Sequence, residues 1–141
     1  MALALIVALP FLGMILPLLA DRLGRSACSV AAGLAPMLAL ILLLSQQSSV
    51  FAGELVRVKL SWLPSLGLNL SLRLDGLGFL FALLIIGIGL LVILYARYYL
   101  AKQEPMGRFF AFLLLFMGAM LGVVLSENLL LMLMFWELTS L

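Results

Sequence analysis

Four apolar runs, each long enough to cross a lipid bilayer, dominate this chain of 141 residues. They cover residues 2–20, 26–44, 76–99 and 109–125, and a fifth run begins at 128 and continues to 141. A helix needs about 20 mostly apolar residues to cross the ~30 Å hydrocarbon core. The composition is 67% hydrophobic and only 10% charged, which excludes a water-soluble enzyme and a disordered tail. The sequence therefore predicts an all-α integral membrane protein with four complete transmembrane helices and the start of a fifth.

The first and last apolar runs raise the question of what the chain represents. A removable signal peptide has a basic segment before its apolar run, whereas the first basic residue here, Arg22, follows the run. The first run is therefore expected to remain as a helix. The fifth run, 128–141, spans only ~21 Å at 1.5 Å per residue, and no glycine, proline or basic cluster ends it. We expect the chain to be the N-terminal part of a longer transmembrane domain, through either truncation or a split subunit.

The distribution of basic residues predicts the orientation of the helices. Loops that alternate between the two membrane faces place five basic residues on one face and three on the other. The five are Arg22, Arg25, Arg97, Lys102 and Arg108, and the three are Arg57, Lys59 and Arg73. Cytoplasmic loops carry an excess of Lys and Arg. The sequence therefore predicts a multi-pass protein of the inner (plasma) membrane with its N-terminus and its long loop outside.

The long loop between the second and third spans has a periodicity of its own. From Val56 and again from Leu66, apolar residues alternate with polar residues or glycine, and Pro64 separates the two stretches. Such alternation on both sides of a turn predicts an outer β-hairpin over residues 55–74 with one apolar face. Because an isolated hairpin is marginally stable in water, this face is expected to lie on the helix ends or on a neighbouring protein of the same complex. The alternative is an irregular amphipathic loop.

Three polar residues stand at the predicted boundaries of the membrane. Asp75 precedes the third span, and Glu127 and Asn128 stand at the start of the fifth. Asp and Asn are favoured at helix N-caps, where negative charge also suits the helix dipole. Capping is the favoured interpretation for these residues, and a role at an ion entrance is the alternative.

Glu137 is the candidate for chemistry. It follows Asn128 by nine residues, ~14 Å along a helix, which places it close to the bilayer midplane. A carboxylate there costs roughly 2.5–3.5 kcal/mol, and such residues usually face a bundle interior and mark ion or proton pathways. No basic residue of this chain lies at that depth, so we expect the partner of Glu137 beyond Leu141 or on another subunit. A purely structural carboxylate is the alternative.

Other kinds of site find little support in the composition. The chain has no histidine, a single cysteine and a net charge of +2. It shows no phosphate-binding loop, metal-ligand cluster or nucleophile triad, so we expect no cofactor, no metal and no enzymatic activity. Gly118 and Gly122 form a GxxxG pattern in the fourth span, which either supports close helix packing or arises by chance in a glycine-tolerant membrane helix.

Several motifs from about Trp62 onward resemble a known family. They are RLDGLG at 73–78, YARYY at 95–99, RFFAF at 108–112, ENLL at 127–130 and FWELTSL at 135–141. Together they resemble the antiporter-like subunits shared by respiratory complex I and the Mrp multisubunit cation/proton antiporters, and the last motif is closest to the large Mrp A protein. The resemblance implies a subunit with inverted helical repeats and an outer hairpin. It also implies that Glu137 aligns with an essential intramembrane glutamate, which in the family pairs with a lysine absent from this chain.

The sequence and the resemblance lead to three hypotheses about function, of which two describe active transport subunits and one describes an inactive fragment. The first is a membrane subunit of a multisubunit antiporter that exchanges cytoplasmic Na⁺ for external H⁺, with Glu137 as proton relay and the other antiporter subunits and the lipid bilayer as partners. The second is a proton-pumping subunit of complex I or of a membrane-bound hydrogenase, which the Leu-Thr-Ser sequence after Glu137 disfavours. The third is a fragment that inserts into the membrane but moves no ions by itself.

Overall fold

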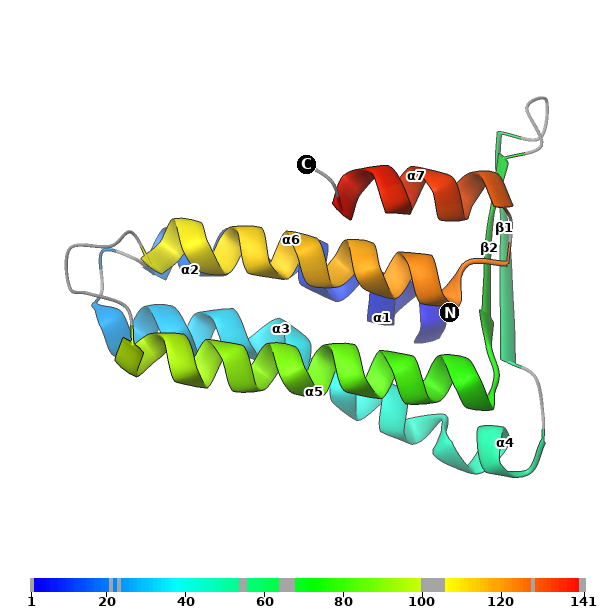
Figure 1. Cartoon of the computed structure of the whole chain (residues 1–141), viewed down its shortest axis with the longest axis horizontal. Helices are drawn as coiled ribbons and strands as arrows, with labels where there is room; N and C mark the ends of the chain where they lie inside the picture. Colours follow the sequence, from blue (N-terminus) through cyan, green and yellow to red (C-terminus); the bar gives the residue numbers. More distant parts are fainter. Residues whose placement is uncertain are drawn as a thin grey trace.

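Long apolar helices lie side by side, and a two-stranded sheet lies across one end of them (Figure 1). The computed structural model describes residues 2–20, 22, 24–53, 56–63, 68–99, 106–127 and 129–139. Four stretches are long and apolar enough to cross a membrane. They are Leu3–Ala20, Ala27–Ser45, Gly76–Tyr98 and Gly107–Leu125. The four predicted spans are therefore confirmed, and a shorter apolar helix, Leu129–Thr139, follows them.

The first span consists of two helices, α1 (Ala2–Gly13) and α2 (Ile15–Ala20). The break falls four residues before Pro17, because a proline ring clashes with the carbonyl of the residue four positions earlier and cannot donate a hydrogen bond to it. Gly13 also lies directly against the next span, since a Cβ at this position would stand 2.3 Å from the Cβ of Ala35. The apolar run predicted one continuous helix here, and Pro17 accounts for the difference.

The second span is α3 (Arg25–Ser45), and a short helix, α4 (Gln47–Phe51), follows it. The buried thiol of Cys28 in α3 donates a hydrogen bond to the carbonyl of Pro17, 3.5 Å away, and so connects α3 to α2. The residues after 44 were predicted to form a loop. Instead, a helical turn resumes after Gln46, and the ring of Phe51 packs edge-on against Phe79 of the third span, with ring centroids 5.9 Å apart.

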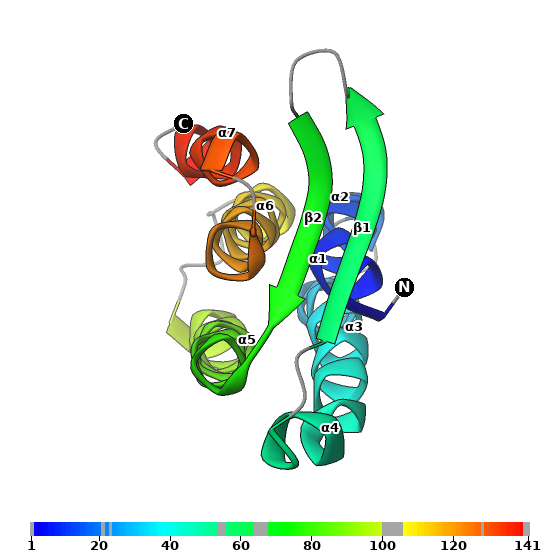
Figure 2. The ribbon, with the colours of Figure 1, turned by 90° about the vertical axis from the view of Figure 1, so that its right-hand side faces the viewer.

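The sheet at the end of the bundle contains β1 (Val56–Leu63) and β2 (Leu68–Leu74), which pair antiparallel with Val56 opposite Leu74. The register shifts between Leu60 and Leu63. The predicted turn at Pro64 lies outside the described residues. Leu72 and Leu74 are buried in the main core, whereas Arg73 between them is exposed. The described part of β2 thus places apolar side chains on the helix ends, across which both strands run (Figure 2).

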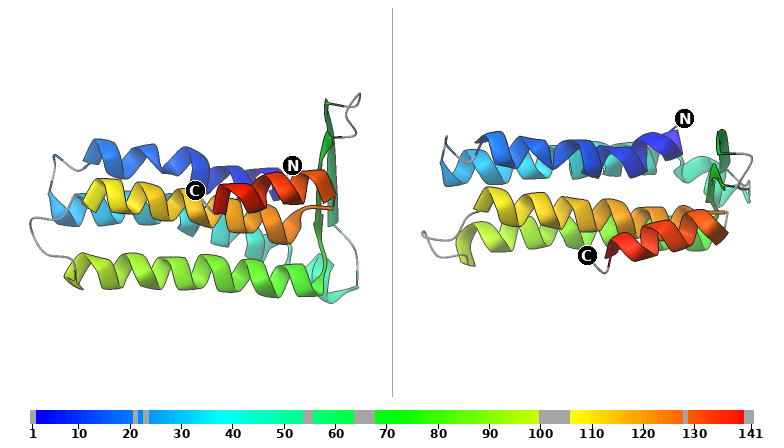
Figure 3. Two further views of the ribbon diagram at one scale, coloured as in Figure 1. Left: turned by 45° about the horizontal axis from the view of Figure 1, so that its top comes forward. Right: turned by 90° about the horizontal axis from the view of Figure 1, so that it is seen from above.

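The remaining helices are α5 (Gly76–Tyr99), α6 (Met106–Leu125) and α7 (Leu129–Thr139). Helix α6 begins three residues before the predicted start at 109. After a short turn, α7 runs back along α6, away from the sheet, as two further views also show (Figure 3). The larger hydrophobic core gathers near the sheet, and a smaller one lies toward the other end around Cys28, Ala32, Ile93, Ala96 and Phe110.

Candidate functional site

Helix α7 carries Glu137, the predicted proton relay, on an otherwise apolar segment. Glu137 stands eight residues after Leu129, which is ~12 Å along the helix axis. Leu131 and Phe135 are buried against the rest of the bundle, whereas Glu137 is exposed in this chain. The carboxyl group therefore lies well inside the apolar length of α7, on a side of the helix that this part of the protein leaves uncovered.

The packing of α7 depends on two glycines of α6, Gly118 and Gly122, which we call the glycine face. A Cβ at Gly122 would stand 2.4 Å from Cγ of Phe135, and a Cβ at Gly118 would stand 2.8 Å from Cε2 of Phe11 in α1. Both distances are shorter than real Cβ contacts, so each ring occupies space that only glycine leaves open. The GxxxG pattern thus serves close packing, as small residues do in membrane helices.

Phe11 and Phe135, the aromatic pair, also contact each other. Their ring centroids are 6.3 Å apart and their planes are inclined by 25°, a stacked arrangement within the range of favourable aromatic contacts. The pair connects α1, the glycine face of α6 and α7 at one place in the core. Neither ring was identified from the sequence, and the only signal for them was the GxxxG pattern, which does not specify its partners.

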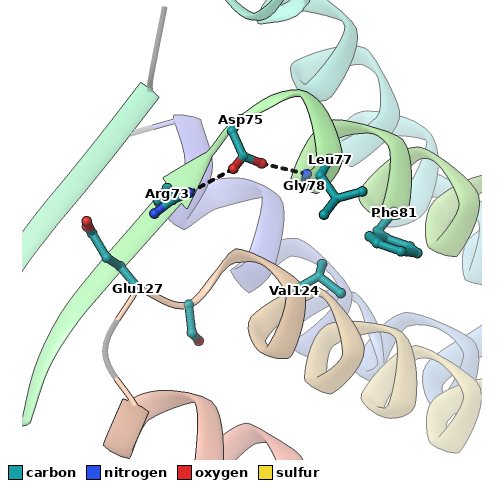
Figure 4. A pocket seen from close by; sticks show the side chains of 8 residues that line it. Arg73, Asp75, Leu77, Gly78, Phe81, Val124 and Glu127 are labelled. Carbon is teal, nitrogen blue, oxygen red and sulfur yellow. Dashed lines mark hydrogen bonds and ion pairs between the residues drawn. The ribbon is translucent and has the colours of Figure 1, made fainter.

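Asp75 caps the N-terminus of α5 at the sheet end. Its Oδ1 accepts a 2.7 Å hydrogen bond from the N–H of Gly78, the third residue of the helix, and its carbonyl accepts the first helical bond from Phe79. Its Oδ2 lies 2.9 Å from Nη2 of Arg73, as Figure 4 shows. The hydrogen bond from Gly78, followed by that from Arg73, lowers the pKa of Asp75 below its ordinary value of 3.8. This geometry is that of an N-cap.

Glu127 holds the turn between α6 and α7 against the sheet. Its carboxylate forms an ion pair of 3.2 Å with Arg57 of β1, and its N–H donates a 2.9 Å hydrogen bond to the carbonyl of Ser71 in β2. The neighbouring Ser126 pairs with Leu72 as an isolated bridge. Asn128, the third predicted boundary residue, lies outside the described residues. The turn that starts α7 is therefore attached to both strands.

A cavity of about 370 Å³ lies between these groups. Arg73, Asp75, Ser126 and Glu127 line it, together with apolar side chains of α5 and α6, and Glu137 is not among its lining residues (Figure 4). The structure thus brings Asp75 and Glu127 to one cavity, and each carboxylate forms an ion pair with an arginine. Within the described ranges, no group of three His, Cys, Asp or Glu residues could hold a metal ion.

Comparisons with known proteins identify relatives along the whole chain. Residues 62–110 match the family described as NADH-Ubiquinone oxidoreductase (complex I), chain 5 N-terminus. A protein of Rhizobium meliloti (strain 1021), named as the probable A/B subunit of a K(+)/H(+) antiporter, is 44% identical over 138 residues, which are 98% of this chain and 14% of the relative. The A1 subunit of a Na(+)/H(+) antiporter from Staphylococcus aureus (strain JH9) is 52% identical over 105 residues, or 74% of this chain and 13% of the relative.

Solved structures share the fold. The Mrp complex from Dietzia sp. DQ12-45-1b contains a chain that matches 99% of this one with a TM-score of 0.78 and 32% identity, over 15% of its own length. A chain of the archaeal membrane-bound sulfane sulfur reductase matches 99% of this one with a TM-score of 0.82 and 21% identity, over 22% of its own length. This chain thus spans a small share of the relatives it matches, and it belongs to the antiporter-like subunit family that Mrp-type antiporters share with complex I.

Proposed function

We propose that this chain works within a membrane subunit of a multisubunit monovalent cation/proton antiporter, with Glu137 as an intramembrane proton relay. Support comes from relatives that are named as Na(+)/H(+) and K(+)/H(+) antiporter subunits and from the similarity to a chain of an Mrp complex. In this proposal cytoplasmic Na⁺ leaves as external H⁺ enters, and the partners are the other subunits of the complex. The proton gradient supplies the free energy, so the exchange requires no cofactor.

The setting of Glu137 is the observation that carries the proposal. Leu133, one helical turn before Glu137, and Leu130, nearly two turns before it, are exposed, so the carboxyl group stands on an apolar flank of α7. A charge in hydrocarbon costs roughly 2.5–3.5 kcal/mol on insertion scales. Ionisable residues at such places usually mark ion or proton pathways. A carboxyl group that takes up and releases a proton can pass it across the apolar part of the membrane.

A carboxamide substitution tests this role. In everted vesicles that contain the complete antiporter complex, Glu137→Gln is expected to lower Na⁺-dependent proton flux at least ~100-fold, because the amide cannot carry a proton. The amount of assembled complex should not change, and Glu137→Asp should retain part of the flux. Glu127→Gln is the matched control, since Glu127 forms an ion pair at the sheet end and its variant should retain flux. Full flux in Glu137→Gln would contradict the proposal.

A redox-driven proton pump is the second candidate function. The match of residues 62–110 to the complex I family favours it, because the same helices occur in complexes that electron transfer drives. The two candidates differ in their driving force. An antiporter moves protons when only a Na⁺ gradient is imposed on vesicles, whereas a redox-driven pump requires an electron donor and an acceptor. Vesicles that hold this chain alone would reveal whether it moves ions without partners.

We also propose a plasma-membrane location with the sheet end outside. The excess of Lys and Arg at the other end of the helices supports this orientation. In a Cys28→Ala background, an impermeant thiol reagent added to intact cells should label Gln47→Cys at the sheet end and not Arg22→Cys at the opposite end. Labelling of only the second variant would reverse the orientation.

A further inference from the structure

We propose that Phe135 is a positioning residue. The contact of its ring with Gly122 fixes the rotation of α7 about its axis and so the direction in which Glu137 faces. This inference rests on the proposed function of Glu137 and adds to it a part of the protein that controls the relay. Neither ring of the aromatic pair bears a group that could carry a proton. Their effect on transport would therefore act through the placement of the carboxyl group.

The contacts around Phe135 leave its ring little freedom. The ring fills the space beside Gly122, where even a methyl group would stand 2.4–2.6 Å from ring atoms. On another side it stacks on Phe11, which in turn occupies the space beside Gly118. Phe135 itself is 7% exposed. The backbone of α6 and a second aromatic ring therefore hold it in one place.

This contact matters because, apart from Leu131, which is buried on the same face as Phe135, the side chains of α7 do little to select a rotation. Every residue of Leu129–Thr139 except Glu137 and Thr139 is apolar, and lipid tails accommodate any such face about equally well. Glu137 follows Phe135 by two residues, which is ~200° around a helix of 3.6 residues per turn. When Phe135 faces the core, Glu137 is consequently directed to the uncovered side of α7. A rotation of ~20° would move a side chain ~5–6 Å from the axis by about 2 Å.

Two glycine substitutions provide a matched test in the complete complex. In Gly122→Ala, the new methyl group displaces the Phe135 ring and turns or shifts α7. We expect flux per assembled complex to fall about 10- to 100-fold, since a displacement near 1 Å at a reacting group can have that effect. The pH dependence of the remaining flux should also shift. The control is Gly87→Ala in α5, where a Cβ would meet nothing within 4 Å, and it should behave like the unaltered protein.

A second variant keeps the test decisive if Gly122→Ala does not assemble. Phe135→Leu keeps an apolar side chain but removes the ring, so it should also lower flux per assembled complex. The double variant Gly122→Ala, Phe135→Leu should recover flux relative to Gly122→Ala, because the smaller side chain admits the methyl group. The other charged side chains on the elements packed against Phe135 and α7 are Arg108 on α6 and Arg73 on β2, and α1 has none. Neither arginine is substituted in these variants.

The outcomes separate this inference from the proposed function. If Glu137→Gln abolishes flux while Gly122→Ala and Phe135→Leu lower only the amount of complex, with unchanged flux per complex and an unchanged pH dependence, Phe135 is a packing residue and the inference is wrong. If Glu137→Gln keeps its flux, the proposed function fails first. Loss of flux per complex in Gly122→Ala or Phe135→Leu, together with normal flux in Gly87→Ala, supports the positioning role.

Discussion

The sheet end of the molecule and the middle of α7 treat carboxylates in opposite ways. At the sheet end, Asp75 and Glu127 each form an ion pair with an arginine of the two-stranded sheet, and Asp75 also caps α5. In α7, Glu137 stands on an apolar side of the helix, and two residues earlier the ring of Phe135 packs closely against Gly122. The first two carboxylates connect secondary structure elements, whereas the third stands on the exposed side of an apolar helix.

In the proposed function, this difference separates structural carboxylates from the transport carboxylate in a chain without histidine. Carboxylates at a membrane boundary remain in contact with water and arginine, so their charge costs little free energy. Here the two ion pairs connect the strands to the starts of α5 and α7. A carboxyl group on an apolar helix stands where ionisable residues usually mark ion or proton pathways. That setting is the basis for the relay role proposed for Glu137.

The largest structural effect is expected from removal of the aromatic contact. Phe135→Ala should lower the free energy of unfolding by about 3 kcal/mol, near the lower end for buried Phe→Ala changes, since lipid replaces part of the lost contact. The neighbouring Trp136→Ala is the control, because Trp136 is 58% exposed and should change stability far less. Thermal denaturation of the solubilised complex measures both. Equal effects would contradict the packing described for α7.

A smaller effect is expected at the cap of α5. Asp75→Ala removes the acceptor for the N–H of Gly78 and should cost about 1 kcal/mol of stability. The amount of assembled complex should therefore fall, whereas flux per assembled complex should stay unchanged. Immunoblots of the membrane fraction alongside flux measurements separate the two quantities. Normal assembly with lost flux would instead assign Asp75 to the ion entrance.

The smallest effect concerns the charge of Asp75. Its pKa is lowered in the folded protein by Gly78 and Arg73, so the ionised form adds stability at pH values above 3.8 that disappears as the pH falls through the lower folded pKa. Asp75→Asn retains a capping side chain but lacks this dependence. The small stability difference between the two proteins should hold from about pH 5 to 8, by ordinary carboxyl titration, and vanish in stronger acid. A difference that grew in acid would contradict the assigned contacts.

Much of the fold could be predicted from residue patterns of short range. Apolar runs near 20 residues predicted the spans, and alternation indicated strands in the region where β1 and β2 lie. Pro17 is visible in the sequence, but the break at Gly13 and Met14 depends on local sterics that a hydropathy pattern does not report. Helix α4 was missed because residues 47–51 have no helical periodicity.

The candidate site was harder to predict, because tertiary contacts determine its parts. The depth of Glu137 follows from counting residues, but its direction does not, since α7 is apolar on nearly all sides. The local sequence predicts neither the contact between Phe135 and Gly122 nor the ion pair between Arg57 and Glu127. Both join segments that are separated in the chain, and only the folded arrangement brings them together.

The claim that Glu137 alone among these carboxylates exchanges protons within the membrane can be tested by infrared difference spectroscopy. The measurement follows the carbonyl band of protonated carboxyl groups in the complete complex as Na⁺ is added at constant pH. The account predicts a Na⁺-dependent band that is lost in Glu137→Gln and retained in Glu127→Gln and Asp75→Asn. A band that persists in Glu137→Gln, or that disappears with either boundary carboxylate, would contradict it.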